Sequence, residues 1–468
     1  MSDQSGIDDE TDKALSISAG LKLMIIRRSS VLVLLQWKKQ AVMISVLLLM
    51  AATVNATDKS RIFDLQECLD IALKQSPVIK AAGLDMEASR ESLRSSKGAL
   101  LPRFDLNAAY MKENQAIPYI PAESVTIPPK FSDEVYSWNA YLRIPVYEGG
   151  RLTSLVAFAE LEKNIQSARI AFTEQELVAN IMNTFNKLLQ LAELKKANIM
   201  SVEALERQRG NTELLVKAGR AANVELLRIG VQLAGERQNL IKTGEAINRT
   251  RNLLAFFMGI DAHEISDVSG SLGIRAGIKE QDVGAFIKSR PDIVILAERV
   301  KQAGKKVDIA DARRYPSVGL VGNYGNKAGV GAEDRKEVWE AGIVASINIF
   351  DGEITASDIR REQALQKKAQ EELRLAESKA RTEIENALSF FREAQQRLEV
   401  AQKALDQSGE ALRIEGLKYE TGAGTITDVL LAQSSMSFAH ANYYQALYDN
   451  NAAIVEYQRA TGTIEVKQ

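Results

Sequence analysis

The chain has 468 residues, 46% of them hydrophobic, and a formal net charge of -2. Its 59 Lys and Arg residues are balanced by 61 Asp and Glu residues, which removes the basic surplus that a nucleic-acid-binding protein uses against phosphates. A single cysteine, Cys68, excludes an internal disulfide framework and a multi-cysteine zinc site, and His263 and His440 are too isolated for a two-histidine metal site.

The N-terminal extension, residues 1–56, has the features of a secretory signal peptide. Lys38 and Lys39 precede an apolar run, and small residues around Ala56 suit a signal peptidase. The run of about 13 apolar residues is shorter than the roughly 20 that a transmembrane helix needs. Acidic residues near the start are unusual in such a leader, so Met24 is an alternative start to Met1. We expect an exported protein in which Cys68 is a small core residue.

The remainder of the chain is a tandem duplication. At an offset of 214 residues, Pro77 matches Pro291 and Tyr110 matches Tyr324. At an offset of 203 residues, three glycines of the first copy match three of the second: Gly149, Gly219 and Gly259 with Gly352, Gly422 and Gly462. One deletion between these blocks reconciles the two offsets. The sequence therefore predicts a first repeat over 57–262, a linker over 263–280, a second repeat over 281–464 and a tail over 465–468.

Long helices are expected in both repeats, because no proline lies between 146 and 290 or after 316. In the first of these tracts apolar residues follow a coiled-coil spacing, flanked by a second stripe: Val178, Ile181, Phe185, Leu188 and Ala192, then Leu177, Thr184 and Leu191. A helix with two such seams packs against neighbours on both sides. We expect helical hairpins over about 151–258 and 353–461. Opening helices over about 64–98 and 281–313 would stack on the shorter hairpin arms.

Each repeat also contains two segments with the two-residue period of a β-strand. They span about 102–115 and 137–147 in the first repeat, and about 316–325 and 338–350 in the second. Tyr147 is expected on the polar face. The residues expected on the apolar, lipid-facing side are Phe104, Leu106, Tyr110, Trp138, Leu142, Ile144, Val146, Val318, Leu320, Tyr324, Ile343, Ile347 and Ile349.

Strands of about ten residues cross a bilayer when tilted, with apolar residues outward. The alternative for such strands is a sheet in a soluble domain. These four strands are the only sheet expected in the chain, and a closed membrane barrel needs at least about eight strands. Because an open edge in lipid leaves unpaired groups at several kcal/mol each, several copies would have to share one barrel. Three copies with twelve strands make the smallest sensible ring.

The order of leader, helix, strand pair and long hairpin, given twice, resembles the TolC-like outer-membrane efflux (outer membrane factor) family over about 61–464. The motifs that carry the resemblance are ALKQSP at 72–77, PVYEGGR at 145–151, KAGRAANVE at 217–225 and YETGAGTITDVL at 419–430. The resemblance implies a mainly α fold with a small β part. It implies a homotrimer with a twelve-stranded outer-membrane β-barrel, continued by a periplasmic α-helical barrel.

The resemblance further implies a passive duct that is not an enzyme and takes no cofactor. Its partners would be a periplasmic adaptor (membrane fusion) protein, an inner-membrane RND or ABC pump, and outer-membrane lipid, with no nucleic acid. The function expected first is the channel of a tripartite efflux system for small molecules. A type I protein secretion channel is an alternative that nothing in the chain separates from it, and a soluble periplasmic coiled-coil scaffold is an alternative of another class.

Site residues are expected at the two turns between long helices, where the adaptor would dock. Gly219 and Gly422 would allow the reversals, and Asn223 and Thr427 would cap the following helices. Arg220 and Glu225 belong to the same expected tip surface.

Two tip residues, Tyr419 and Asp428, match positions that constrict the periplasmic mouth in the best-known family member. That protein has an arginine at the position of Gly424 and a second acidic residue at that of Leu431. The resemblance therefore does not imply that the same contacts close the periplasmic mouth here. Three copies of Asp428 could form a ring of carboxylates in the trimer. The alternative is that Asp428 is an exposed acidic residue near a helix N-terminus, where it interacts favourably with the helix dipole.

Overall fold

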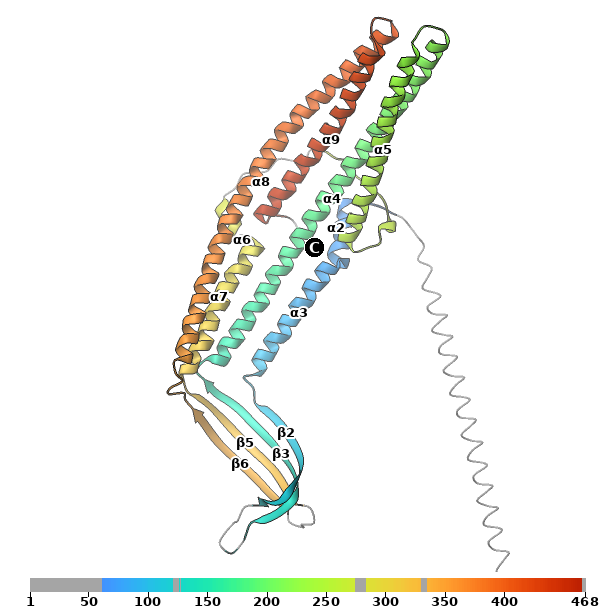
Figure 1. The fold of residues 1–468 in the computed structure, drawn as a ribbon. Coiled ribbons are helices and arrows are strands. Elements are labelled where there is room, and N and C mark those ends of the chain that lie inside the picture. Colours follow the sequence, from blue (N-terminus) through green and yellow to red (C-terminus); the bar gives the residue numbers. More distant parts are fainter. Residues whose placement is uncertain (1–60, 121–125, 127, 274–282, 330–334, 465–468) are drawn as a thin grey trace, which may run out of the picture. The chain divides into compact units, whose positions relative to one another are not determined.

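The computed structural model describes residues 61–120, 126, 128–273, 283–329 and 335–464. The expected signal peptide lies outside these residues. Within them, helices predominate, and the strands form one four-stranded and one two-stranded sheet (Figure 1). The mainly α class with a small β part is confirmed.

Two long helical hairpins form the largest part of the described chain. The first joins α4 (Arg151–Lys217) to α5 (Asn223–Met258), and the second joins α8 (Ile354–Glu420) to α9 (Ile426–Thr461). The helices α4 and α8 have 67 residues each, and α5 and α9 have 36 each. At 1.5 Å per residue, the longer helices extend about 100 Å.

Both opening helices are broken by a proline, which corrects the single helices expected from the sequence. The first repeat has α2 (Leu65–Gln75) and α3 (Pro77–Gly98), and the second has α6 (Val283–Ser289) and α7 (Pro291–Asp311), followed by the 3-10 turn η2 (Ala312–Arg314). The residues before the prolines, Ser76 and Arg290, have ψ values of 127° and 131°. A following proline disfavours helical geometry at the preceding residue, so each helix ends there.

The short hairpin arms end against the start of the opening helices. Gly259, which ends α5 at φ 73°, lies so close to α3 that a Cβ there would be 3.0 Å from the proline ring of Pro77. Gly462 ends α9 at φ 70° in the same way, beside Arg290 and Pro291. The columns α5–α3 and α9–α7 are therefore stacked end to end in both repeats, as expected.

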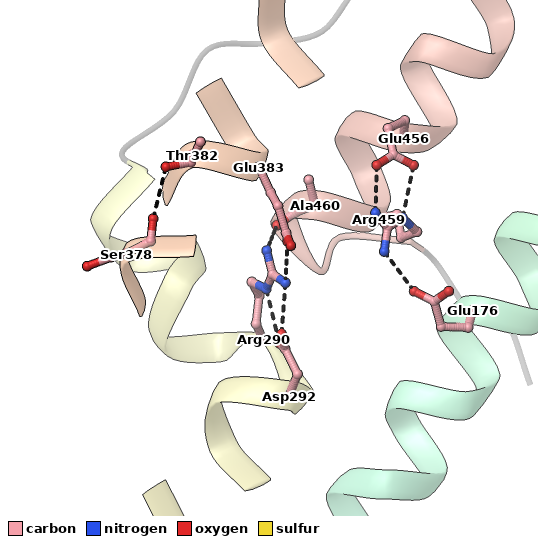
Figure 2. Close-up of polar contacts among 9 residues, drawn as sticks. All are labelled: Glu176, Arg290, Asp292, Ser378, Thr382, Glu383, Glu456, Arg459 and Ala460. Atoms are coloured by element: carbon pink, nitrogen blue, oxygen red, sulfur yellow. Dashed lines mark hydrogen bonds and ion pairs between the residues drawn. The ribbon is translucent and has the colours of Figure 1, made fainter. Parts of the chain in front are cut away.

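Arginines hold the junction of the second repeat (Figure 2). The buried guanidinium of Arg290 donates to the Ala460 carbonyl at 2.9 Å and pairs at 2.8 Å with both Asp292 and Glu383. Nearby, Arg459 joins Glu456 on its own helix to Glu176 on α4. These bonds tie the end of α9 to α4, α7 and α8, because a buried arginine is stable only when its donors are paired.

Helix α4 packs on both sides, as its two apolar seams predicted. Leu177, Ile181, Phe185 and Leu188 join a core with α2 and α5. Val178 instead meets Val455 of α9. Every residue of the two predicted stripes is buried except Ala192, which is half-buried.

The four-stranded sheet is antiparallel with the order β2-β3-β5-β6. Its strands are β2 (Arg103–Ile120), β3 (Lys130–Glu148), β5 (Ser317–Gly329) and β6 (Arg335–Ser346). Strands β2 and β3 are longer than expected. Proline is tolerated in an edge strand at an irregularity, and Pro118 lies at a register shift of edge strand β2.

A second, two-stranded sheet was missed by the sequence analysis. Strand β1 (Arg61–Phe63) pairs in parallel with β4 (Ile265–Val268), which follows the 3-10 turn η1 (Ala262–Glu264). Phe63 and Ile265 are buried in the core formed with α2, α4 and α5. Strands this short carry no readable period, so the expectation of a single sheet was wrong.

Candidate functional site

One face of the four-stranded sheet is apolar across all four strands. The register places Leu106 opposite Ala140, Ala140 opposite Tyr324 and Tyr324 opposite Trp339. The neighbouring row joins Phe104 to Leu142, and a third joins Ile144 to Leu320 and Ile343. Phe104 and Leu106 are each 69% exposed and Ile343 is 72% exposed, which places this apolar face on the outside of the described chain.

The apolar face forms a band with aromatic residues at both ends. From Tyr136 to Val146, strand β3 extends about 33 Å, or about 25 Å in height at a 40° tilt, which is the thickness of a membrane barrel's apolar band. Beyond Tyr110 the same face becomes charged, with an ion pair of 2.6 Å between Lys112 and Glu134. The exposed aromatic residues near the two ends are Tyr110, Tyr136, Trp138, Tyr324 and Trp339, then Phe104, Tyr147, Tyr315 and Phe350. The sequence analysis did not identify these two aromatic groups.

The opposite face is polar, as expected from the alternation. Asn107 pairs with Asn139, Asp105 with Tyr141, and Tyr141 with Asn323. The two faces of the sheet therefore present different chemistry, one suited to lipid and the other to water.

Three residues of the expected apolar face lie where the alternation breaks. A β-bulge at Val146 places Tyr147 opposite Val318, so the expected positions of Val146 and Tyr147 are corrected. A bulge inserts one unpaired residue and shifts the alternation by one. Ile347 and Ile349 were expected in the fourth strand, but β6 ends at Ser346 and both residues follow it.

The helical tips reverse through glycines. Gly219 and Gly422 have φ values of 70° and 77°, and the next N–H donates to a carbonyl five residues back, from Arg220 to Leu215 and from Ala423 to Lys418. This pattern ends a helix with its last carbonyls satisfied, and it needs the left-handed conformation that glycine adopts readily.

The caps of the following helices differ from those expected. Asn223 is the first residue of α5, its N-cap is Ala222, and no side chain caps that helix. In α9 the cap is Thr425, not Thr427: the Thr425 hydroxyl accepts from the Asp428 N–H, and the Asp428 carboxylate accepts from the Thr425 N–H. The spacing of Thr425 and Asp428 is that of a capping box, a signal present in the sequence.

Polar bonds join the two tips to each other. The Tyr419 hydroxyl on α8 donates to Glu225 of α5 at 3.1 Å. The Arg228 guanidinium on α5, which the sequence analysis missed, donates to Thr427 of α9 at 2.6 Å. Burial raises the pKa of Tyr419, and the Glu225 carboxylate raises it further. Beneath these bonds an apolar cluster of Ile229, Ile426 and Val429 connects the same helices.

Asp428 is exposed, and the hydrogen bonds from Thr425 hold its pKa below the usual range. Gly424 lies so close to Lys418 that a Cβ would be 2.9 Å from the lysine Cβ. The turn therefore has no room for a side chain at this position unless Lys418 shifts. Leu431, one turn beyond Asp428, is 68% exposed, and Arg220 is also exposed.

Among the described residues no group of three or more His, Cys, Asp or Glu side chains is placed to hold a metal ion. None of the described helices combines the length and apolar character needed to cross a membrane.

Comparisons with known proteins agree with this geometry. A family model described as outer membrane efflux protein matches residues 68–259 and again residues 284–463. The chain is 20% identical over 414 residues to outer membrane protein TolC of Vibrio cholerae, which covers 86% of this chain and 91% of TolC. It is 25% identical over 439 residues to outer membrane protein OprJ of Pseudomonas aeruginosa, which covers 88% of this chain and 87% of OprJ.

A solved structure has the same fold. The CmeC outer membrane channel of Campylobacter jejuni matches with a TM-score of 0.75 at 18% identity, over 86% of this chain and 87% of CmeC. Because the family model matches twice and covers most of the chain, this protein belongs to the outer membrane efflux protein family, and it is an outer-membrane channel rather than an enzyme.

Proposed function

We propose that this protein is the outer-membrane duct of a tripartite efflux system, working as a homotrimer with a periplasmic adaptor and an inner-membrane RND or ABC pump. The observation that carries the proposal is the sheet of four strands, apolar on one face and polar on the other, with β2 and β6 as free edges among the described residues. Lipid does not tolerate such edges, and three copies supply the twelve strands of a closed barrel.

The helical part of the fold supports a role in transport rather than in catalysis. The long hairpins extend about 100 Å from the sheet and would form the wall of the duct. Their tips, which are joined by the Tyr419–Glu225 and Arg228–Thr427 hydrogen bonds, are the surface that an adaptor would bind. The energy for transport would come from the pump.

Deletion of the gene tests the efflux role. We expect greater sensitivity to drugs, metals or detergents, restored by the wild-type gene on a plasmid. Unchanged sensitivity together with the loss of a secreted protein from the medium would instead identify type I secretion.

Membrane fractionation tests the assembly. The protein should be found with the outer membrane and have the mass of a trimer in detergent. A monomer that stays soluble without detergent would contradict the duct.

A further inference from the structure

We propose that Arg103 and Arg143 form an anion-binding collar on the inner wall of the barrel, where they bind carboxylate- or phosphate-bearing solutes that pass through the duct. The collar is this pair of arginines in each copy of the chain. The inference rests on the proposed trimeric duct and adds to it a preference for the charge of the solute.

Both arginines lie on the polar face of the sheet, near the end that joins the helices. The register pairs Arg103 of β2 with Arg143 of β3, next to the apolar pair of Phe104 and Leu142. Residues directly opposite each other in antiparallel strands point to the same side, and neighbours along a strand point to opposite sides. The two guanidinium groups therefore face the interior of a closed barrel and not the lipid.

The positive charge of this pair is only partly compensated. Like charges directly opposite each other destabilise a strand pair. Asp105 accepts a hydrogen bond from Nε of Arg103 at 3.0 Å, and the Arg103 side chain is 77% exposed. The two terminal nitrogens of Arg103 have no partner among the described residues. A guanidinium in this state can bind a carboxylate or a phosphate through two parallel hydrogen bonds.

Arg143 forms no ion pair with any described residue. Its guanidinium carbon lies 5.6 Å from the centre of the Tyr141 ring, and the group donates a long hydrogen bond of 3.5 Å to the Tyr141 hydroxyl. A guanidinium beside an aromatic ring is attracted to it but keeps its full charge. Arg143 is therefore held in position without being neutralised.

The wall beside the two arginines is open. In the same row of the sheet, Arg143 is followed by Val321 of β5 and Gly342 of β6. A Cβ at Gly342 would have no other atom within 4 Å. A carboxylate or phosphate group therefore has room to lie against the wall next to the guanidinium groups.

The adjacent row of the polar face contains two acidic residues, but these do not cancel the collar. The residues of this row are Asp105, Tyr141, Asn323 and Glu340. Asp105 is already paired with Arg103. Glu340 lies two strands and two residues from Arg143, which is about 12 Å. This distance exceeds the Debye length of about 10 Å at 0.1 M salt, so Glu340 screens Arg143 weakly.

Threefold symmetry would repeat the collar at one level of the barrel, with two guanidinium groups from each copy around the path of the solute. Rings of charged side chains set the ion preference of pores, and rings of arginine or lysine favour anions. Every solute that crosses the barrel passes this level. The collar would therefore retain anionic solutes briefly and favour their passage over that of cations.

Recordings of the full-length protein in planar bilayers test the collar. The test variant is Arg143→Gln, which leaves the Arg103–Asp105 pair in place. Arg143→Lys keeps the charge but loses the planar guanidinium. Lys112→Gln is the matched control, because it removes a positive charge from the opposite face of the same sheet. The reversal potential in a KCl gradient gives the chloride-to-potassium permeability ratio, and inorganic phosphate on one side serves as the anionic ligand.

We expect Arg143→Gln to lower the permeability ratio at least threefold in about 0.01 M KCl, where the Debye length is about 30 Å. The effect should disappear in about 1 M KCl, where that length is about 3 Å. Phosphate should reduce the wild-type current at a concentration at least threefold lower than it needs for Arg143→Lys, whose permeability ratio should stay as in the wild type. Lys112→Gln should match the wild type in both measurements.

Two results would overturn the collar and leave the duct intact, provided that the variants still conduct as trimers. One is an unchanged permeability ratio in Arg143→Gln, or an equal change in Lys112→Gln. The other is equal sensitivity of Arg143→Lys and the wild type to phosphate. A wild-type protein that is monomeric by mass in detergent, or that forms no channels, would contradict the proposed function itself.

Discussion

At the scale of single residues, the two tips are equivalent in sequence position but are held differently. Thr425 and Asp428 form a complete capping box at the start of α9, whereas Ala222 at the equivalent position of α5 has no side-chain oxygen. The second tip is therefore fixed by its own side chains. The first depends on the glycine turn and on bonds to the second tip.

Thr425→Ala should loosen the start of α9. The cap loses its hydroxyl acceptor, and such a loss costs about 1 kcal/mol. Hydrogen exchange of the Asp428 amide should become several-fold faster. Thr427→Ala, which removes only the acceptor for Arg228, should leave that amide protected. Equal effects of the two substitutions would mean that the cap has been misassigned.

Acid should loosen the same helix start. The pKa of Asp428 is lower in the folded protein because Thr425 donates to its carboxylate. A lowered pKa adds stability above the unfolded value, about 3.9, and that stability is lost as the pH falls through the folded pKa. Exchange at the start of α9, corrected for its intrinsic pH dependence, should rise below about pH 4. The start of α5, which has no capping box, serves as the control, and a response there of the same size would contradict the assignment.

Tyr419→Phe should weaken the connection between the tips. The lost hydrogen bond to Glu225 has a charged acceptor, and at this half-buried site it contributes about 1 kcal/mol. Amides near both turns should exchange faster. In a double-mutant cycle with Glu225→Gln, the second substitution should add little once the first is present. Strictly additive effects would show that the two side chains do not interact.

At the scale of elements, two adjacent alanines in β2 lie on opposite faces of the sheet and allow the two faces to be compared. Ala108 lies on the apolar face, opposite Trp138, and Ala109 lies on the polar face, opposite Ser137. Arginine facing lipid costs up to about 2–4 kcal/mol near the middle of a bilayer. Ala108→Arg should therefore reduce the amount of trimer in the outer membrane, and Ala109→Arg should not. Similar losses from both would show that the faces are assigned wrongly.

Much of the element structure could be predicted from the sequence, because it depends on local rules. The absence of proline predicted the long hairpins, and the alternation of residues predicted which side chains share a face of the sheet. The breaks at Pro77 and Pro291 were missed, although the rule for the residue before proline gave a signal for both. The end of β6 was not predictable from the segment itself, because a strand continues only where a neighbour accepts its hydrogen bonds.

The candidate site was predicted less completely. The glycine reversals at Gly219 and Gly422 followed from residue type alone, but the caps were placed two residues too late in α9 and one residue too late in α5. Arg228 was missed because its partner, Thr427, is distant in sequence and is brought near only by the packing of α5 beside α9. Contacts between repeats leave no short-range pattern.

At the scale of the whole molecule, both the sheet and the helical part of the described chain have a side without a neighbouring element. The second repeat offers β6 and α8 with one free side each, and the first repeat offers β2. Each repeat meets the other inside one chain through β3–β5 and α4–α7.

The matched lengths of α4 with α8, and of α5 with α9, constrain how such a protein evolves. An insertion in one arm would push its tip out of line with the other and break Tyr419–Glu225 and Arg228–Thr427. Lengthening is tolerated only when both halves of the gene gain the same number of codons. The two repeats can therefore diverge in amino-acid composition, but their helices must keep equal lengths. A longer channel, able to cross a wider periplasm, requires insertions of the same size in both repeats.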